Sequence, residues 1–377
     1  MLFPKGLLVV CLSVLWCFPA VAQISEEPVE VFGYFQTTGE FSIDNEHERR
    51  DNTSFNAQQL NILFRKELTS RWSSFINVEF LNSFSSKENL GSATLDEAWL
   101  RYRHDHRFDL RMGLLVPRFN NLNEIKNRTP LLPYAIRPIV YEESFGDFFE
   151  LAEYVPERAF VQAMGFWQME DVKLDYALYL GNSPNLIQNG EIGQSGIDST
   201  TTFLVGGRVG LRTSSIRIGF SGTRDELNFG TDFPQLAGID PNRLVERPRY
   251  RWGTDLSVNL GRWLLEAEGI IVRYDFDVTS LKVQRQFLYA TLGYYDTERL
   301  FVYGTYWYID EAADVMDISE EANLFVYSGG ASYALLDRIT LKAQYATVKV
   351  DHRQTGGDAF DESGFVYKFV AAVSVLF

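Results

Sequence analysis

The chain has 377 residues, of which 46% are apolar and 15% aromatic, and its formal net charge is −15. No internal run of about 18 apolar residues occurs, which excludes a membrane-spanning helix. Aromatic residues and glycines are interleaved along the chain, which excludes low-complexity disorder.

The first 22 residues have the features of a secretory signal peptide. Lys5 supplies a positive charge, residues 6–18 are apolar, and Ala20 and Ala22 fit a small-x-small cleavage site. We therefore expect residues 1–22 to be removed and residues 23–377 to form the exported protein.

The mature chain is acidic and contains no cysteine. Cys11 and Cys17 both lie in the expected signal peptide, so neither a disulfide nor a cysteine-bound metal is possible after cleavage. Only Lys5 of the 35 basic residues is lost with that peptide, which leaves 34 basic residues against 50 acidic ones. An exported protein of this charge is a poor candidate for binding nucleic acid.

Segments of about ten residues alternate apolar and polar side chains along the mature chain, a pattern typical of a transmembrane β-barrel. In one of them Leu60, Ile62 and Phe64 share a face, while Asn61 and Arg65 occupy the other. The pattern predicts sixteen strands, at residues 29–41, 56–68, 72–84, 94–103, 107–116, 158–168, 172–182, 201–212, 216–224, 249–260, 263–274, 281–295, 299–309, 324–335, 338–350 and 363–377.

The connections between these strands alternate in length. The short ones are residues 69–71, 104–106, 170–171, 213–215, 261–262, 296–298 and 336–337. The others, mostly longer, are residues 42–55, 85–93, 117–157, 183–200, 225–248, 275–280, 310–323 and 351–362. This alternation predicts short periplasmic turns at one rim and long extracellular loops at the other.

The predicted fold class is therefore all-β, a transmembrane antiparallel β-barrel of about 16 strands. In hydrocarbon every backbone polar group needs an internal partner, which a closed sheet provides. A barrel of this size encloses a lumen too wide for its own side chains to fill. Only residues 23–28 precede the first expected strand, too few for a plug domain, so we expect a channel.

The last expected strand ends in an aromatic residue. Phe369, Ala371, Val373, Val375 and Phe377 alternate up to the terminus. This resembles the signal that outer-membrane barrels present to their assembly machinery. We expect the chain to engage that barrel assembly machinery and to reside in the cell outer membrane, among its lipid and lipopolysaccharide.

The longest expected connection, residues 117–157, is apolar and stiff. Pro130, Pro133 and Pro138 restrict its backbone, and connections this long in compact proteins are usually functional. We expect this third long loop to fold into the lumen and to set the constriction. An external cap or a subunit contact is the alternative.

Two stretches carry a resemblance to a known family. Residues 95–100, LDEAWL, and residues 111–119, RMGLLVPRF, are similar to the fourth and fifth strands of the phosphate-selective porin family, within the bacterial outer-membrane porins. The resemblance implies a homotrimer and passive uptake of small anions. This sequence departs from the family in lacking a lysine-rich lumen, so the resemblance does not extend to phosphate selectivity.

Charged side chains in the strands are expected to face the lumen, because Arg or Lys facing lipid at mid-depth would cost about 2–4 kcal/mol. Most of the acidic excess falls in the long loops, so the barrel wall is mildly basic. The expected pore-lining residues are Arg65, Arg101, Arg103, Arg111, Arg208, Arg212, Arg217, Arg251, Asp109, Glu266 and Glu268.

The 117–157 loop is basic in its first half and acidic in its second. An acidic half facing the arginines of the wall would create a transverse field that favours polar solutes, whereas a basic half facing the lumen would favour anions. The sequence leaves both arrangements open. The expected constriction residues are Arg118, Lys126, Arg128, Arg137, Glu142, Glu143 and Asp147.

Signals of catalysis or metal binding are weak. His104 and His106 lie in an expected tight turn without a third ligand, and residues 219–222 lie in a strand rather than at a nucleophile elbow. No enzymatic activity, metal site or cofactor is predicted. The predicted function is a porin for passive diffusion of small hydrophilic solutes. The alternative is a receptor or adhesin barrel that uses residues 225–248 and 310–323 and has a sealed lumen.

Overall fold

The computed structural model describes residues 28–44, 50–81, 92–126, 128–141, 154–183, 185–186, 192–193, 200–227, 246–275, 281–315, 318–356 and 360–377. Sixteen strands form one closed sheet, and β8 (Asn185–Leu186) and β9 (Ile192–Gly193) pair separately. The barrel strands are β1 (Glu30–Asp44), β2 (Arg50–Glu67), β3 (Trp72–Leu81), β4 (Ser92–Arg103), β5 (Asp109–Leu115), β6 (Ala159–Met169), β7 (Val172–Gly181), β10 (Leu204–Arg212), β11 (Ile216–Leu227), β12 (Arg247–Leu260), β13 (Trp263–Tyr274), β14 (Leu281–Tyr295), β15 (Leu300–Val315), β16 (Ile318–Leu336), β17 (Ile339–Thr355) and β18 (Phe360–Leu376).

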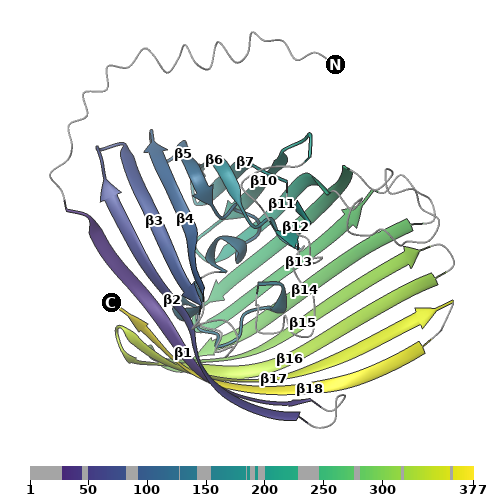
Figure 1. The fold of residues 1–377 in the computed structure, drawn as a ribbon. Coiled ribbons are helices and arrows are strands. Elements are labelled where there is room, and N and C mark those ends of the chain that lie inside the picture. Colours follow the sequence, from purple (N-terminus) through teal and green to yellow (C-terminus); the bar gives the residue numbers. More distant parts are fainter. Residues whose placement is uncertain are drawn as a thin grey trace.

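The sheet closes because β1 pairs with both β2 and β18. Gly39 of β1 lies opposite Phe55 of β2 and opposite Ala371 of β18. Figure 1 shows the ring of tilted strands that results. Closure pairs the backbone N–H and C=O groups that an open sheet edge would leave exposed. The predicted sixteen-stranded antiparallel barrel is confirmed.

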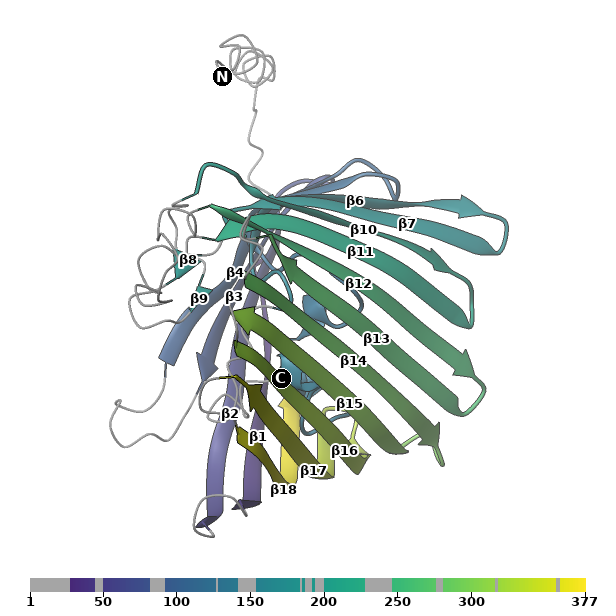
Figure 2. The same ribbon diagram turned by 90° about the vertical axis from the view of Figure 1, so that its right-hand side faces the viewer.

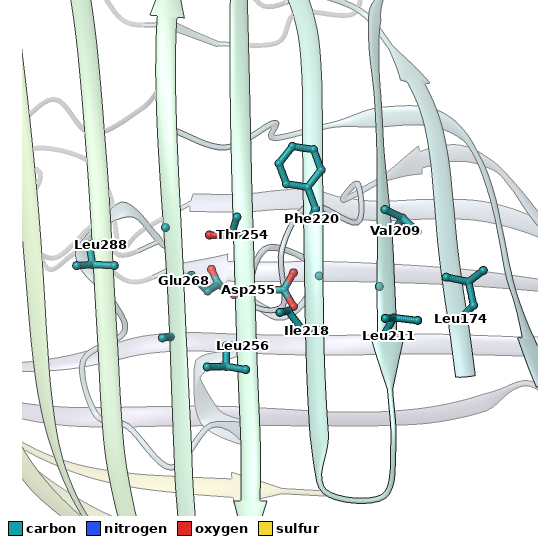
Figure 3. A pocket seen from close by; sticks show the side chains of 14 residues that line it. Leu174, Val209, Leu211, Ile218, Phe220, Thr254, Asp255, Leu256, Glu268 and Leu288 are labelled. Carbon is teal, nitrogen blue, oxygen red and sulfur yellow. The ribbon is translucent and has the colours of Figure 1, made fainter. Parts of the chain in front are cut away.

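Side chains alternate between the two faces of the wall. In β12, Arg251 and Asp255 are 2% exposed, whereas Trp252 between them is 47% exposed. Large exposed apolar side chains recur on the outward positions of neighbouring strands, and Figure 3 shows Ile218 of β11 and Leu288 of β14 among them. The outer surface is therefore an apolar belt, which is typical of a wall that faces lipid.

Short turns join the strands at one end of the barrel, which we call the short-turn end (Figure 2). They lie within two residues of the predicted turns. These turns are residues 68–71, 104–108, 170–171, 213–215, 261–262, 296–299 and 337–338.

Three connections at the other end are much shorter than the sequence predicts. The loop predicted at residues 42–55 is reduced to residues 45–49, because β1 runs to Asp44 and β2 begins at Arg50. The predicted loop at residues 310–323 is wrong, because β15 continues to Val315, β16 begins at Ile318, and Asp310 lies opposite Asn323. The loop predicted at residues 351–362 is likewise shortened, since β17 runs to Thr355 and β18 begins at Phe360. In these hairpins charged side chains occupy both faces, as Asp310 and Glu311 do at successive positions of β15, so the strands continue without apolar alternation.

Three short 3-10 helices interrupt residues 117–141, namely η1 (Asn123–Ile125), η2 (Thr129–Leu131) and η3 (Ile139–Tyr141). Within the described ranges, no helix is long and apolar enough to cross a membrane. Gly113 precedes this stretch with a φ of +126°, and a Cβ there would lie 2.3 Å from the carbonyl oxygen of Ala98. Only glycine fits this position, where the register between β5 and β6 shifts.

Candidate permeation path and constriction

Residues 117–141, which we call the inner segment, cross the interior of the barrel (Figure 1). The backbone N–H of Asn120 donates to Oγ of Ser221 on β11 at 3.0 Å. The backbone N–H of Ile136 donates to Oε1 of Gln344 on β17 at 2.8 Å. The segment therefore contacts inward-facing side chains of strands that lie far apart around the ring.

The inner segment packs on apolar side chains of the wall. Phe119, Leu122 and Ile136 are at most 4% exposed and belong to one cluster with inward side chains of β13–β18, which we call the dry half. Packing the segment there removes apolar surface from water. The wall members of the cluster are Ile270, Val272, Phe287, Tyr289, Trp307, Ile309, Leu324, Val326, Ala346, Val348, Val366, Val370 and Ala372.

The expected lumen is too wide for the wall's own side chains to fill, and in the dry half the inner segment fills part of it. The sequence carries a signal for this packing, because β15 has the consecutive residues Tyr306, Trp307 and Tyr308, with Trp307 facing inward and 1% exposed. A strand that is apolar on both faces is covered on both faces. Here the outer face belongs to the apolar belt and the inner segment covers the inner face.

Two predicted pore-lining carboxylates, Glu266 and Glu268, hold the inner segment. The hydroxyl of Tyr134 donates to Oε2 of Glu266 at 2.6 Å, and that of Tyr141 donates to Oε2 of Glu268 at 2.7 Å. Burial, reinforced by the two carboxylate charges, holds the pKa of both tyrosines well above the usual value, so they remain donors. Glu268 is 2% exposed, so it faces inward as expected but is covered by the segment.

Lys342 of β17 fixes the middle of the inner segment. Its Nζ donates to the carbonyl oxygens of Thr129 at 3.0 Å and Pro130 at 3.2 Å, and to Oε1 of Gln36 at 2.9 Å. Three acceptors satisfy a buried cation that would otherwise be costly to remove from water. The helix η2 is thereby attached to β1 and β17.

The inner face of β4–β7 and β10–β12, which we call the arginine wall, carries the predicted pore-lining arginines except Arg65. Nε of Arg101 donates to Oδ2 of Asp109 at 2.6 Å, and Nε of Arg103 donates to the same oxygen at 3.3 Å. The side chains of Arg101 and Arg103 are 21% and 57% exposed, whereas Asp109 is buried. Two guanidiniums share one carboxylate, which leaves one positive charge in excess.

A second pair of arginines shares Glu124 of the inner segment. Arg111 contacts it at 3.3 Å and Arg118 at 2.9 Å. Burial opposes ionisation of Glu124, but the two guanidiniums outweigh burial and lower the pKa of this carboxyl to about 2. The group therefore keeps one excess positive charge at neutral pH.

The other constriction residues of the basic half also lie along the inner segment. Arg128 contacts Glu97 of β4 at 3.4 Å, and Arg137 is half-buried. Lys126 is half-buried too, and burial lowers its pKa to about 8. The acidic residues expected in the second half, Glu142, Glu143 and Asp147, lie outside the described residues.

Arg208 of β10 lies between a carboxylate of the neighbouring strand β7 and a carboxylate of β12, two strands away. Its Nη1 donates to Asp175 of β7 at 2.6 Å, and its Nη2 donates to Asp255 of β12 at 2.7 Å. The side chain of Arg208 is completely buried. This residue faces inward as predicted, but it is closed off by its ion pairs and does not meet open water.

A third shared carboxylate, Asp225, lies further along the same wall. Arg249 contacts it at 2.7 Å and Arg251 at 3.0 Å, and all three side chains are at most 2% exposed. The side chain of Arg251 therefore faces inward, as predicted, but it is buried and does not meet open water. Asp225 and Arg249 are not among the residues predicted from the sequence, although the alternation of β12 puts Arg249 on the same face as Arg251, two residues later.

Three cations form a row near the short-turn end of the arginine wall. Arg212 of β10 lies opposite Lys173 of β7 and opposite Arg217 of β11. All three side chains are partly exposed, and no ion pair joins them to a carboxylate of the described residues. Like charges on facing strands repel, and the ring of Phe166, 5.3 Å from Nζ of Lys173, offsets part of this positive charge.

Arg65 lies apart from these groups, at the short-turn end of β2. Its side chain is 50% exposed, between Glu30 at 3.7 Å and Glu67 at 3.0 Å. It therefore stands at the mouth of the barrel. In the described part of the chain, no group of three or more His, Asp or Glu side chains could hold a metal ion.

Solved structures of outer-membrane channels have a fold similar to that of this chain. The anion-selective porin from Comamonas acidovorans has a TM-score of 0.59 at 12% identity, over 93% of this chain and 99% of the porin. The channel DcaP of Acinetobacter baumannii has a TM-score of 0.58 at 12% identity, over 93% of this chain and 97% of DcaP. OmpF of Salmonella typhi, solved in complex with daunomycin, has a TM-score of 0.55 at 10% identity, over 93% of this chain and 97% of OmpF. No protein-family model and no curated protein matches the chain.

Proposed function

We propose that this chain is an outer-membrane porin, a water-filled channel through which small hydrophilic solutes diffuse passively, with anions preferred. One observation carries the proposal: cations exceed carboxylates on the arginine wall. Asp109 and Glu124 are each shared by two arginines, whereas Arg208, which pairs with two carboxylates, is completely buried. Fixed positive charge along a lumen raises the local concentration of anions.

Solutes are proposed to pass between the inner segment and the arginine wall. The side chains of Arg101, Arg111, Arg118 and Arg128 are 16–32% exposed, so water reaches them. The inner segment closes the dry half, so the remaining passage is narrow and lined by guanidiniums. In this proposal the segment sets the constriction, and no reaction is catalysed.

The outer surface supports a location in the outer membrane. Next to the short-turn end, aromatic pairs lie on the outer wall, with ring centroids 4.9 Å apart for Trp72 and Tyr102 and 4.8 Å apart for Trp263 and Tyr294. Aromatic girdles of this kind sit at the interface between lipid and water. Cleavage of residues 1–22, delivery by the barrel assembly machinery, contact with lipopolysaccharide and assembly as a homotrimer belong to the same proposal.

Planar-bilayer recording of refolded residues 23–377 tests the channel. We expect stable open-channel currents in KCl, because water reaches guanidiniums inside the barrel. A bilayer that receives the detergent alone is the control. A folded barrel that passes no current at any salt concentration or voltage would favour a receptor with a sealed lumen, the alternative that the packed dry half supports.

A further inference from the structure

A cavity of about 560 Å³ lies inside the mouth at the short-turn end. It is bordered by the start of β1, the end of β18, the turn between β16 and β17, and the inner segment. Its volume falls within the range of about 300–1,000 Å³ that small-molecule sites occupy. We call it the mouth site, and the lining residues that matter are Phe32, Tyr34, Leu63, Arg128, Leu131 and Arg338.

One side of the mouth site is apolar and open. Phe32 shares the inward face of β1 with Tyr34, yet Phe32 is 39% exposed whereas Tyr34 is 3% exposed. Leu131 of η2 is 45% exposed across the cavity. A flat apolar ligand would cover the ring of Phe32 and the side chain of Leu131 and release the water on them.

The other side presents guanidiniums. Arg338 is exposed in the turn at residues 337–338, and no hydrogen bond or ion pair joins its side chain to any other described residue. The side chain of Arg128 is 32% exposed, whereas its partner Glu97 is 6% exposed, so the cavity meets the cation rather than the carboxylate. A guanidinium pairs with a carboxylate through two parallel N–H bonds.

The last residue of the chain borders the same cavity. An oxygen of its terminal carboxylate accepts the backbone N–H of Gly33 at 2.9 Å. No ion pair joins Phe377 to Arg338, both of which the structure describes. The donors of Arg338 are therefore available to a ligand.

We propose that the mouth site binds small aromatic carboxylates. The ring lies against Phe32 and Leu131, and the carboxylate pairs with Arg338, with Arg128 supplying a second positive charge. This inference goes beyond passive diffusion. It does not depend on conduction, because a ligand can bind at the mouth without crossing the barrel, although Arg128 borders both the mouth site and the proposed passage.

The site is tested by titrating the detergent-refolded chain with benzoate and measuring binding by isothermal calorimetry or saturation-transfer NMR. We expect benzoate to bind at least about tenfold more tightly than acetate, which has the charge without the ring, and than benzyl alcohol, which has the ring without the charge. Arg338→Gln should weaken benzoate binding by about tenfold, because it removes a charged hydrogen-bond donor. Leu131→Asn should weaken benzoate but not acetate.

Arg299→Gln is the matched control, because Arg299 is an exposed arginine in another turn at the same end and does not line the cavity. Equal benzoate affinity in the Arg338→Gln and Arg299→Gln variants would overturn the proposal, as would benzoate that binds no more tightly than acetate. A barrel that binds benzoate but never conducts would refute the channel and leave the mouth site standing. A conducting barrel that binds no benzoate would refute the mouth site alone.

Discussion

Replacing Arg208 by methionine is expected to lower the free energy of unfolding by about 3–5 kcal/mol. Arg208 is completely buried between Asp175 at 2.6 Å and Asp255 at 2.7 Å. Its removal leaves two carboxylates of like charge in the wall without their shared cation. Breaking a buried ion pair in this way is far more costly than removing both partners.

Urea titration of the refolded barrel in detergent, followed by tryptophan fluorescence, measures this loss. Arg212→Met is the matched control, because Arg212 lies on the same strand without an ion pair to a described residue, and it should change stability by less than about 1 kcal/mol. Adding Asp175→Asn and Asp255→Asn to the Arg208 variant should restore part of the loss. An Arg208→Met barrel as stable as the control would show that the triad is not a stabilising centre.

Deleting residues 125–150 and joining the ends with a short Gly-Ser linker is expected to raise single-channel conductance by roughly twofold or more, because a sixteen-stranded barrel is otherwise wide. The deletion removes η2, the contact of Lys342 with Thr129 and Pro130, and the tyrosine contacts with β13. It also opens the dry half to water, so stability should fall while the pore widens.

The control variant lacks residues 229–244, which belong to the connection between β11 and β12. It shortens a different long connection and should leave conductance unchanged. The double variant Tyr134→Phe and Tyr141→Phe is milder, since it releases the inner segment from Glu266 and Glu268 without deleting it. We expect it to increase current fluctuations. A folded deletion variant with the conductance of the intact protein would place the constriction elsewhere.

The strand count could be predicted from the sequence because lipid imposes alternation on one face of every strand. In β2, for example, one face carries Leu60, Ile62 and Phe64 and the other carries Asn61 and Arg65. In the structure Asn61 is fully buried on the inner side. Where strands leave the lipid this constraint ends, which is why the hairpin around Asp310 was expected to be a loop.

The interior was harder to predict than the wall. Alternation assigns a side chain to a face but not to a partner, so Arg208 could be placed inward while its contact with Asp255, two strands away, could not. Burial of Glu268 depends on Tyr141, which lies more than a hundred residues earlier in the chain. Trp307 facing inward between Tyr306 and Tyr308 was the available sign that the lumen is partly packed.

The reversal potential of the intact protein in a tenfold KCl gradient tests the central claim most directly. If the arginine wall lines the conducting path, the current should reverse near the Nernst potential of chloride, because cations outnumber carboxylates there. Reversal near the potassium potential would contradict an anion-preferring channel along this wall.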